Sequence, residues 1–276
     1  MKPPPFEYHA PRDLGEALRT LAEVGGKVLA GGQSLIPMLN MRLAAPAHLV
    51  DINRLQELRV LETTEDGVRV GAAVRHAEVE RAEAHPLLSR ALKLVAHPVI
   101  RNRGTVVGSL VHADPAAELP AVLAVLGGSV RVARWEGPVR DVGAEEFFVG
   151  PMESAVQPGE LAVSAYFPAL GARTGAAFEE VARRHGDYAL AGVCAVVTLD
   201  EDGDLEAARL ACIGVGPVPV VVDVTDSPAD AARVVRERVE PEDDIHASAH
   251  YRRHLVGVLA ERALRNATRE AGARGA

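Results

Sequence analysis

The chain has 276 residues, of which 48% are hydrophobic and 25% are charged, and its formal net charge is −8. These proportions are typical of globular proteins and exclude collagen-like, low-complexity and wholly disordered chains. The acidic balance argues against nucleic acid as a partner, because neutralising phosphates requires a basic face.

Two cysteines, Cys194 and Cys212, are present, too few to hold an iron–sulfur cluster or a structural zinc ion between them. Both lie in apolar, strand-like segments, as expected of buried thiols in a reducing compartment. The N-terminal sequence MKPPP lacks the apolar stretch of a signal peptide, and no segment comes close to the ~18 uncharged apolar residues of a membrane span. We therefore expect a cytoplasmic protein with no membrane span and no metal site.

The first part of the chain predicts a β-α-β-type unit with a glycine loop inside it. Asp13 and Glu16 form a capping box that begins a helix, and the glycine pair at 25–26 ends it. A short strand over 28–30 leads directly into the loop, and a further short helix precedes a strand over 48–52.

A second unit begins near residue 56. Proline and glycine then cluster over 167–175 and mark the expected domain boundary. The predicted elements between these points are strand 68–72, helical segments over 77–95 broken at Pro86, an irregular glycine-containing stretch over 100–114, helix 119–126, and strands 130–133, 139–142 and 161–167.

The last hundred residues predict a small antiparallel sheet followed by helices. Asp202-Gly203 is a good hairpin turn between two of the strands, and Ser227-Pro228 is typical of a helix start. The predicted elements are strands 178–183, 193–199 and 207–214 and a long helix over about 247–269.

The strongest local motif is AGGQS, residues 30–34, between a predicted strand and a predicted helix. Paired glycines remove the Cβ atoms that would keep a phosphate away from the backbone, so that N–H groups can point at an anion. Ser34 adds a hydroxyl donor. On this motif alone, a tight structural turn is an equally good interpretation.

A second loop of the same kind lies at residues 105–109. Thr105, Gly108 and Ser109 offer small hydroxyl and backbone donors, and Asp114 and Glu118 follow beside a helix start. These carboxylates can accept bonds from sugar hydroxyls or cap the helix. Two such loops in adjacent units favour a ligand with two phosphates, that is, a dinucleotide.

Other groups of functional side chains give weaker evidence for a site. Ser109, His112 and Asp114 lie close in sequence, but no Gly-x-Ser-x-Gly elbow supports a hydrolase triad. Neither a Walker A sequence nor a Rossmann fingerprint is present. His246, His250 and His254 are spaced to share a helix face, where contact with solvent or a partner is favoured over metal ligation.

Three segments together resemble a known family: AGGQSLIPMLNMRLAAPAHLVDI, RNRGTVVGSLVHADPAAELPAVL and RRHGDYALAGV. They resemble the FAD-binding medium subunits of molybdenum hydroxylases, the family of carbon monoxide dehydrogenase and xanthine dehydrogenase. The resemblance implies an α+β fold with a two-lobed FAD-binding domain of the p-cresol methylhydroxylase type. That domain would span residues 1–170, with lobes of about 1–55 and 56–170. A C-terminal domain with a small antiparallel sheet and helices would span 171–276.

The same resemblance implies which residues hold FAD, with its pyrophosphate between the two loops. Glu118 would contact the sugar region of FAD and Tyr188 would pack beside the isoalloxazine ring, while Ala162 is a weaker match. The implied cofactor-binding residues of the two loops are Leu29, Ala30, Gly31, Gly32, Gln33, Ser34, Leu35, Ile36, Thr105, Val106, Val107, Gly108 and Ser109. We add Asp114 to the expected cofactor-binding residues because it closely follows the second loop in the sequence.

This sequence departs from the family pattern at two positions. Val107 stands where the family usually has glycine, which would strain the backbone only if that position required a positive φ angle. Glu118 stands where more distant relatives carry aspartate.

The family chemistry is hydroxylation by water at a molybdenum–pterin centre. By resemblance, this chain would be the FAD subunit of an oxidoreductase, with molybdenum–pterin on a large subunit and two [2Fe–2S] clusters on a small subunit, in a dimer of heterotrimers. It would pass electrons to an external acceptor and carry no catalytic acid, base or nucleophile. Two alternatives are a self-sufficient flavin reductase of the same fold and a non-catalytic subunit that has lost FAD. Carbon monoxide, aldehydes, purines and N-heterocycles all stay open as substrates.

Overall fold

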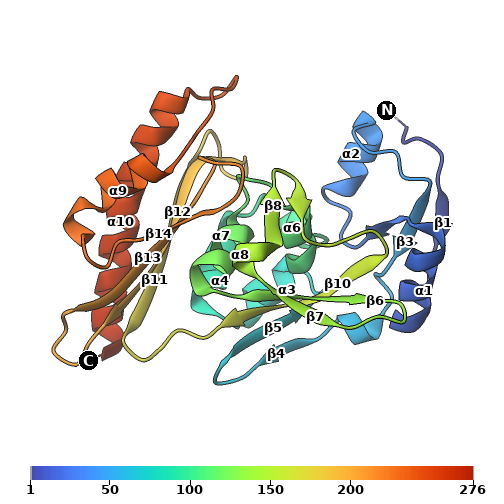
Figure 1. Cartoon of the computed structure of the whole chain (residues 1–276), viewed down its shortest axis with the longest axis horizontal. Helices are drawn as coiled ribbons and strands as arrows, with labels where there is room; N and C mark the ends of the chain where they lie inside the picture. The colour runs from blue at the N-terminus through green and yellow to red at the C-terminus, as the bar shows by residue number, and fades with distance from the viewer. Residues whose placement is uncertain (1, 276) are drawn as a thin grey trace.

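The computed structural model describes residues 2–275, whose elements follow one another in three parts along the long axis of the molecule (Figure 1). The first part is a parallel sheet of order β1-β3-β2 with two helices. Its elements are β1 (Glu7–His9), α1 (Leu14–Val24), β2 (Lys27–Leu29), α2 (Leu35–Met41) and β3 (His48–Asp51).

Helix α1 begins and ends as its sequence predicts. The Asp13 side chain accepts from the backbone N–H of Glu16, and the Glu16 carboxylate in turn accepts from the N–H of Arg12, each at 2.7 Å. Gly25 ends the helix in the left-handed conformation, with φ at 64°. The buried face of α1, which packs on the sheet, consists of Ala17, Leu18 and Leu21.

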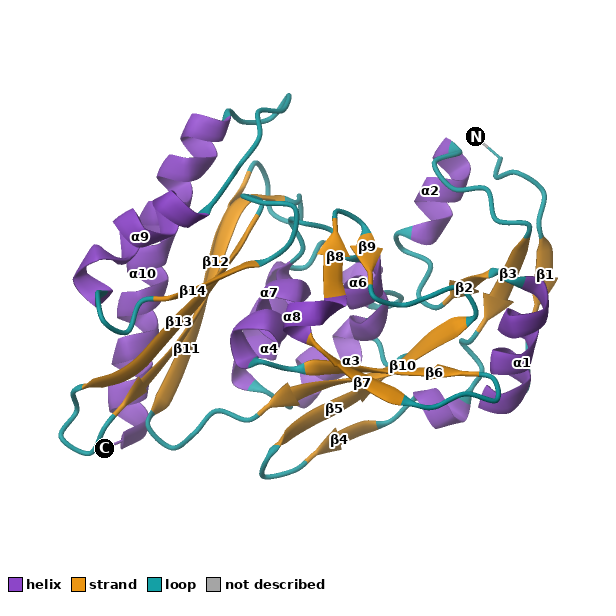
Figure 2. Cartoon of the chain, viewed as in Figure 1, coloured by secondary structure: helices purple, strands orange, loops and turns teal. Residues whose placement is uncertain are grey.

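The second part is an antiparallel sheet of order β4-β5-β10-β6-β7 with helices packed on it (Figure 2). Helix α7 contacts this sheet through β10 and is buried along almost its whole length. The strands of this sheet are β4 (Leu61–Thr63), β5 (Gly67–Gly71), β6 (Ser129–Arg134), β7 (Arg140–Gly143) and β10 (Glu160–Pro168). A separate two-stranded sheet consists of β8 (Phe148–Gly150) and β9 (Glu153–Ser154). The helices are η1 (Gln56–Leu58), α3 (His76–Ala82), α4 (Pro86–Leu94), α5 (Pro98–Arg101), α6 (Val106–His112), α7 (Glu118–Leu126) and α8 (Ala144–Phe147).

The third part is an antiparallel meander, β11-β12-β13-β14, covered on one face by α9 and α10 (Figure 2). Gly175 brings β11 against α10, since a Cβ there would lie 2.1 Å from the carbonyl oxygen of Ala267. The other face of the meander contacts α4 and α7. The elements are β11 (Thr174–Ala182), β12 (Ala189–Leu199), β13 (Leu205–Ile213), β14 (Val220–Asp223), η2 (Pro228–Asp230), α9 (Ala231–Arg238) and α10 (Ala249–Gly275).

The structure confirms the mixed α+β class and the small antiparallel sheet followed by helices, and it corrects three details. Residues 106–112, expected to be irregular, form α6. The sequence does not predict the short strands β1, β4, β8, β9 and β14. His246 precedes α10, so only His250 and His254 share that helix. Within the described part of the chain, no helix combines the length and apolarity needed to cross a membrane.

Candidate functional site: a cleft between two glycine loops

The first glycine loop, residues 30–34, connects β2 to α2. Gly32 has a φ of +73°, a conformation that side-chain-bearing residues rarely adopt. A Cβ on Gly31 would lie 2.3 Å from the carbonyl oxygen of Arg103. Glycine is therefore required twice here, once for the turn and once because the loop packs directly against the segment that precedes the second loop.

Two polar side chains hold the loops together. Asn53 donates to the carbonyl of Ala30 at 2.7 Å. Arg75 donates to the side-chain oxygen of Asn53 and to the carbonyl of Arg103, both at 2.5 Å. Because Asn53 follows β3 and Arg75 precedes α3, this chain of bonds fixes the first part of the molecule against the second.

The second glycine loop, residues 105–109, is the start of α6. Thr105 caps the helix, its hydroxyl accepting from the N–H of Gly108 at 3.2 Å. The Ser109 hydroxyl lies 3.1 Å from Nε2 of His76. Val107 has no positive φ and its side chain lies in the core, so valine is accommodated without backbone strain.

His76 is a site residue that sequence reasoning missed. The side chain is 3% exposed, and burial lowers its pKa to about 4, so the imidazole is neutral at physiological pH. No motif marks it. It reaches the second loop because its N–H donates to the carbonyl of Gly104, beside a β-bridge between Arg75 and Thr105.

Two acidic side chains lie after α6, the helix that the second loop begins. Asp114 accepts from the N–H of Ala116 at 2.9 Å and so stabilises the turn before α7. Glu118 lies in the first turn of α7 and is 8% exposed. Burial, with the neighbouring Glu180 carboxylate, raises the pKa of Glu118 to about 8. At neutral pH this group therefore holds a proton and can donate a hydrogen bond as well as accept one.

A cavity of about 460 Å³ joins these features. It is lined by both glycine loops, by Asp114 and Glu118, by Ala162 of β10, and by Tyr188, which belongs to the third part of the molecule. Of the predicted site residues, only Leu29, Ile36 and Val106 lie outside this lining. Lys27, His76 and Met152 line it although the sequence analysis did not select them.

The structure gives no support to a hydrolase triad. The hydroxyl of Ser109 pairs with His76 and not with His112. Asp114 is engaged with the backbone of its own turn. The site is a binding cleft built mainly from backbone N–H groups, small hydroxyls and apolar walls.

Family models match nearly the whole chain. One described as "FAD binding domain in molybdopterin dehydrogenase" matches residues 4–170, and one described as "CO dehydrogenase flavoprotein C-terminal domain" matches residues 176–267. The chain belongs to the FAD-binding subunits of molybdenum hydroxylases. The resemblance found in the motifs is thereby confirmed, as are FAD as the family's cofactor and the oxidoreductase class.

Individual relatives agree with this assignment. The chain is 40% identical to the 6-hydroxypseudooxynicotine dehydrogenase complex subunit alpha of Paenarthrobacter nicotinovorans, covering 98% of this chain and 97% of that one. It is 35% identical to the carbon monoxide dehydrogenase medium chain of Hydrogenophaga pseudoflava, covering 96% and 97%. These relatives are named as single subunits of dehydrogenase complexes.

Solved structures of the family superpose over the full length. A chain of carbon monoxide dehydrogenase from Hydrogenophaga pseudoflava, in a form that lacks the Mo-pyranopterin moiety, aligns with a TM-score of 0.90 at 34% identity and covers 100% of both chains. A chain of quinoline 2-oxidoreductase from Pseudomonas putida 86 aligns with a TM-score of 0.90 at 34% identity, covering 98% and 99%.

The residues of the cleft fit FAD. Its volume is within the range of cofactor sites. The two glycine loops supply N–H groups and hydroxyls suited to an anionic pyrophosphate. Asp114 and Glu118 suit sugar hydroxyls, and apolar side chains such as Ile52, Ile100 and Leu161 offer a surface for a flat ring.

Proposed function

We propose that this chain is the electron-transferring FAD subunit of a molybdenum-containing hydroxylase. Electrons would reach FAD from two [2Fe–2S] clusters of a small subunit and leave to an external acceptor, and a large subunit would carry the molybdenum–pterin centre. Six chains would form a dimer of heterotrimers. Family membership and the subunit names of the relatives support this proposal.

The observation that carries the proposal is the cleft between the two glycine loops. We propose that residues 30–34 and 105–109 bind the pyrophosphate from its two sides, since the direct packing of Gly31 on Arg103 brings them together. Ser109, oriented by His76, would donate its hydroxyl to a phosphate oxygen. Glu118 would bind the sugar region, and Tyr188 and Ala162 would contact the isoalloxazine.

When bound, FAD would accept electrons one at a time, as iron–sulfur clusters deliver them, and release them singly or in pairs. The chain's own task is to bind it, to shield one side of it from water and to leave the other side reachable. Tyr188, 64% exposed at the rim of the cavity, lies where the ring would meet solvent or a partner. No acid–base pair is needed for that task.

The reacting substrate would be selected elsewhere in the complex. Relatives that match this chain over nearly their full length are named for 6-hydroxypseudooxynicotine, caffeine, carbon monoxide and glyceraldehyde. Such different molecules have no common feature for one conserved flavin subunit to recognise. We propose that the large subunit sets the substrate.

We also propose that the protein is cytoplasmic and does not bind nucleic acid. Both cysteines are free and buried, as in proteins of reducing compartments. The net charge of −8 disfavours binding to the phosphate backbone of nucleic acids. We also propose that the chain divides into two domains, residues 1–170 and 171–276. The proposed boundary lies in the connection between β10, which ends at Pro168, and β11, which begins at Thr174.

Titration of FAD and of FMN into the flavin-free chain tests the function. We expect one FAD per chain, much weaker binding of FMN, and no turnover of organic substrate by the chain alone. Co-purification with a large and a small subunit would add substrate-dependent reduction of the flavin. A protein that binds no FAD would instead support the non-catalytic alternative, and steady substrate turnover by the lone chain would support the self-sufficient reductase.

A further inference from the structure

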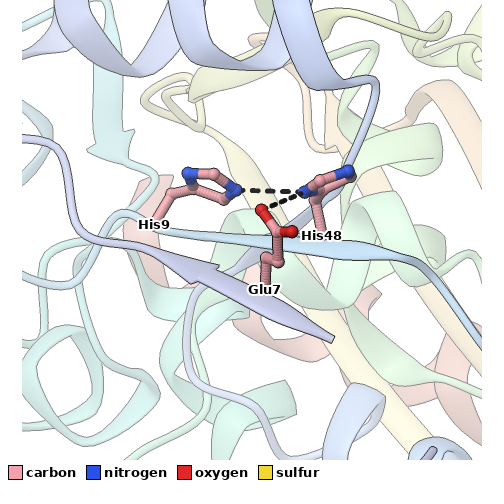
Figure 3. A group of neighbouring side chains, drawn as sticks. All are labelled: Glu7, His9 and His48. Carbon is pink, nitrogen blue, oxygen red and sulfur yellow. Dashed lines mark hydrogen bonds and ion pairs between the residues drawn. The ribbon is translucent and has the colours of Figure 1, made fainter. Parts of the chain in front are cut away.

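Two histidines and a glutamate meet on the parallel sheet of the first part of the molecule. Glu7 and His9 are two residues apart on β1, so their side chains lie on the same face. Glu7 is paired in register with His48 of β3, which brings the third side chain to that face. Figure 3 shows the two rings and the carboxylate turned toward one another.

The spacing of these groups matches a metal coordination sphere. Nε2 of His9 lies 3.1 Å from Nδ1 of His48, and Nδ1 of His48 lies 3.6 Å from a carboxylate oxygen of Glu7. The three ligand atoms all lie within 4.8 Å of one another. A tetrahedral Zn²⁺ with bonds of about 2.0–2.1 Å separates its ligand atoms by about 3.3–3.4 Å. The two shorter separations differ from that value by only a few tenths of an ångström.

The backbone of His48 is closely packed, and the cluster is open to solvent on the side of Glu7. His9 and His48 are partly buried, whereas Glu7 is exposed. Gly26 packs on His48 so closely that a Cβ there would lie 2.7 Å from the carbonyl oxygen of His48. Two imidazoles from paired strands, an exposed carboxylate and access for water suit a three-ligand site with an open fourth position.

We propose that Glu7, His9 and His48 form a binding site for a divalent first-row transition metal, with Zn²⁺ as the ion of choice. Two imidazoles and one carboxylate are a ligand set that Zn²⁺ accepts readily. The ion would replace the contact between the two rings and join β1 to β3 near the start of the chain. The site is separate from the flavin cleft, because its three residues lie outside the cavity lining.

Sequence inspection does not predict this site because His48 is far along the chain from the other two ligands. Only the parallel register of β1 with β3 brings Glu7 and His48 opposite each other. The histidines that the sequence does place at helical spacing, His250 and His254, are both exposed on α10. They provide a matched control, being two histidines of the same chain outside the proposed site.

Calorimetric titration of Zn²⁺ into the FAD-loaded, chelator-treated full-length chain tests the proposal. We expect one ion per chain. His9→Gln and His48→Gln should each weaken binding by more than the about 10–100-fold that loss of an outer-shell partner costs. Glu7→Gln should weaken it less, and the double variant His250→Gln/His254→Gln should bind as the parent does. Retained FAD absorbance reports that each variant is folded.

Amide hydrogen exchange gives a second, local readout. Zn²⁺ should slow exchange at the β1 amides of the parent and leave His48→Gln unchanged. The proposal is overturned if the parent binds no Zn²⁺, which would leave only a hydrogen bond between the two rings. It is equally overturned if binding survives in His48→Gln and disappears in the His250→Gln/His254→Gln control.

Discussion

Gly32→Asp is the sharpest test of the first glycine loop, because it adds a negative charge to the loop that we propose binds a phosphate. A carboxylate about 4 Å from a phosphate charge costs about 1 kcal/mol in water and about 4 kcal/mol at an effective dielectric constant near 20. At 1.4 kcal/mol for each factor of ten, FAD binding should weaken between about 5-fold and about 700-fold.

The structure supplies the controls that separate charge from backbone strain. Gly32 has a φ of +73°, so any side chain there carries a left-handed backbone penalty of about 1–2 kcal/mol. Gly32→Asn has nearly the same shape and the same backbone penalty without the charge. Gly203 has a φ of +87° in a distant hairpin turn with nothing within 4 Å of its Cβ position. Gly203→Asp therefore repeats both the strain and the change in net charge away from the cleft.

Fluorescence titration of FAD into the flavin-free variants measures the effect. Gly32→Asp should bind FAD clearly more weakly than Gly32→Asn, and Gly203→Asp should bind it like the parent. If Gly32→Asp and Gly32→Asn bind FAD equally well, no phosphate lies near this residue. The first loop would then be a structural turn, and the cofactor pose proposed above would be wrong.

Three further variants test other parts of the structure. In the flavin-free protein, Glu118 (pKa raised to about 8 by burial and by Glu180) retains a proton that the unfolded chain releases above its ordinary carboxyl range. The contribution of Glu118 to stability should therefore fall as pH rises from about 5 to 8, by up to about 1.4 kcal/mol per pH unit, and Glu118→Gln should remove that contribution when its urea melts are compared with those of the parent. An unchanged slope would show that another group is responsible. Asn53→Ala removes the bond to the first loop and leaves a carbonyl without its partner, which should cost about 1–3 kcal/mol of stability and weaken FAD binding; unaltered FAD affinity would show that the bond does not shape the loop. Gly175→Ala forces a methyl group into the backbone of α10 and should lower the melting temperature, and a melting temperature equal to that of the parent would contradict the close packing seen here.

Sequence patterns predicted those elements that carry their own local signals. Helix α1 has a capping box, an apolar face and a terminal glycine, and the structure has all three. The β12–β13 hairpin turns at Asp202-Gly203 as predicted, through a connection over residues 200–204 that is longer than a two-residue turn. The two glycine loops were recognisable because both combine glycine with small hydroxyl side chains.

Elements that depend on tertiary contacts have no comparable signal in their local sequence. Helix α6 begins Val-Val-Gly, residues of low helical propensity, and depends on the Thr105 cap and on burial of its valines. Strand β1 has only three residues, two of them exposed, and exists because β3 lies beside it. His76 enters the site through a bond from its backbone to the carbonyl of Gly104. Apart from the Thr105 cap, these contacts connect residues too far apart in sequence to form a pattern.

The cleft has walls from all three parts of the molecule: Gly31 from the first, Ser109 from the second and Tyr188 from the third. A ligand that touches all three is bound only when they are assembled, so its binding free energy is added to the cohesion of the whole chain. Flavin content then becomes a measure of structural integrity. Substitutions far from the cleft, in α10 for example, should yield protein with less flavin even though no contact with the cofactor has changed. In cells, the supply of FAD would in this way help to determine how much of the chain survives degradation.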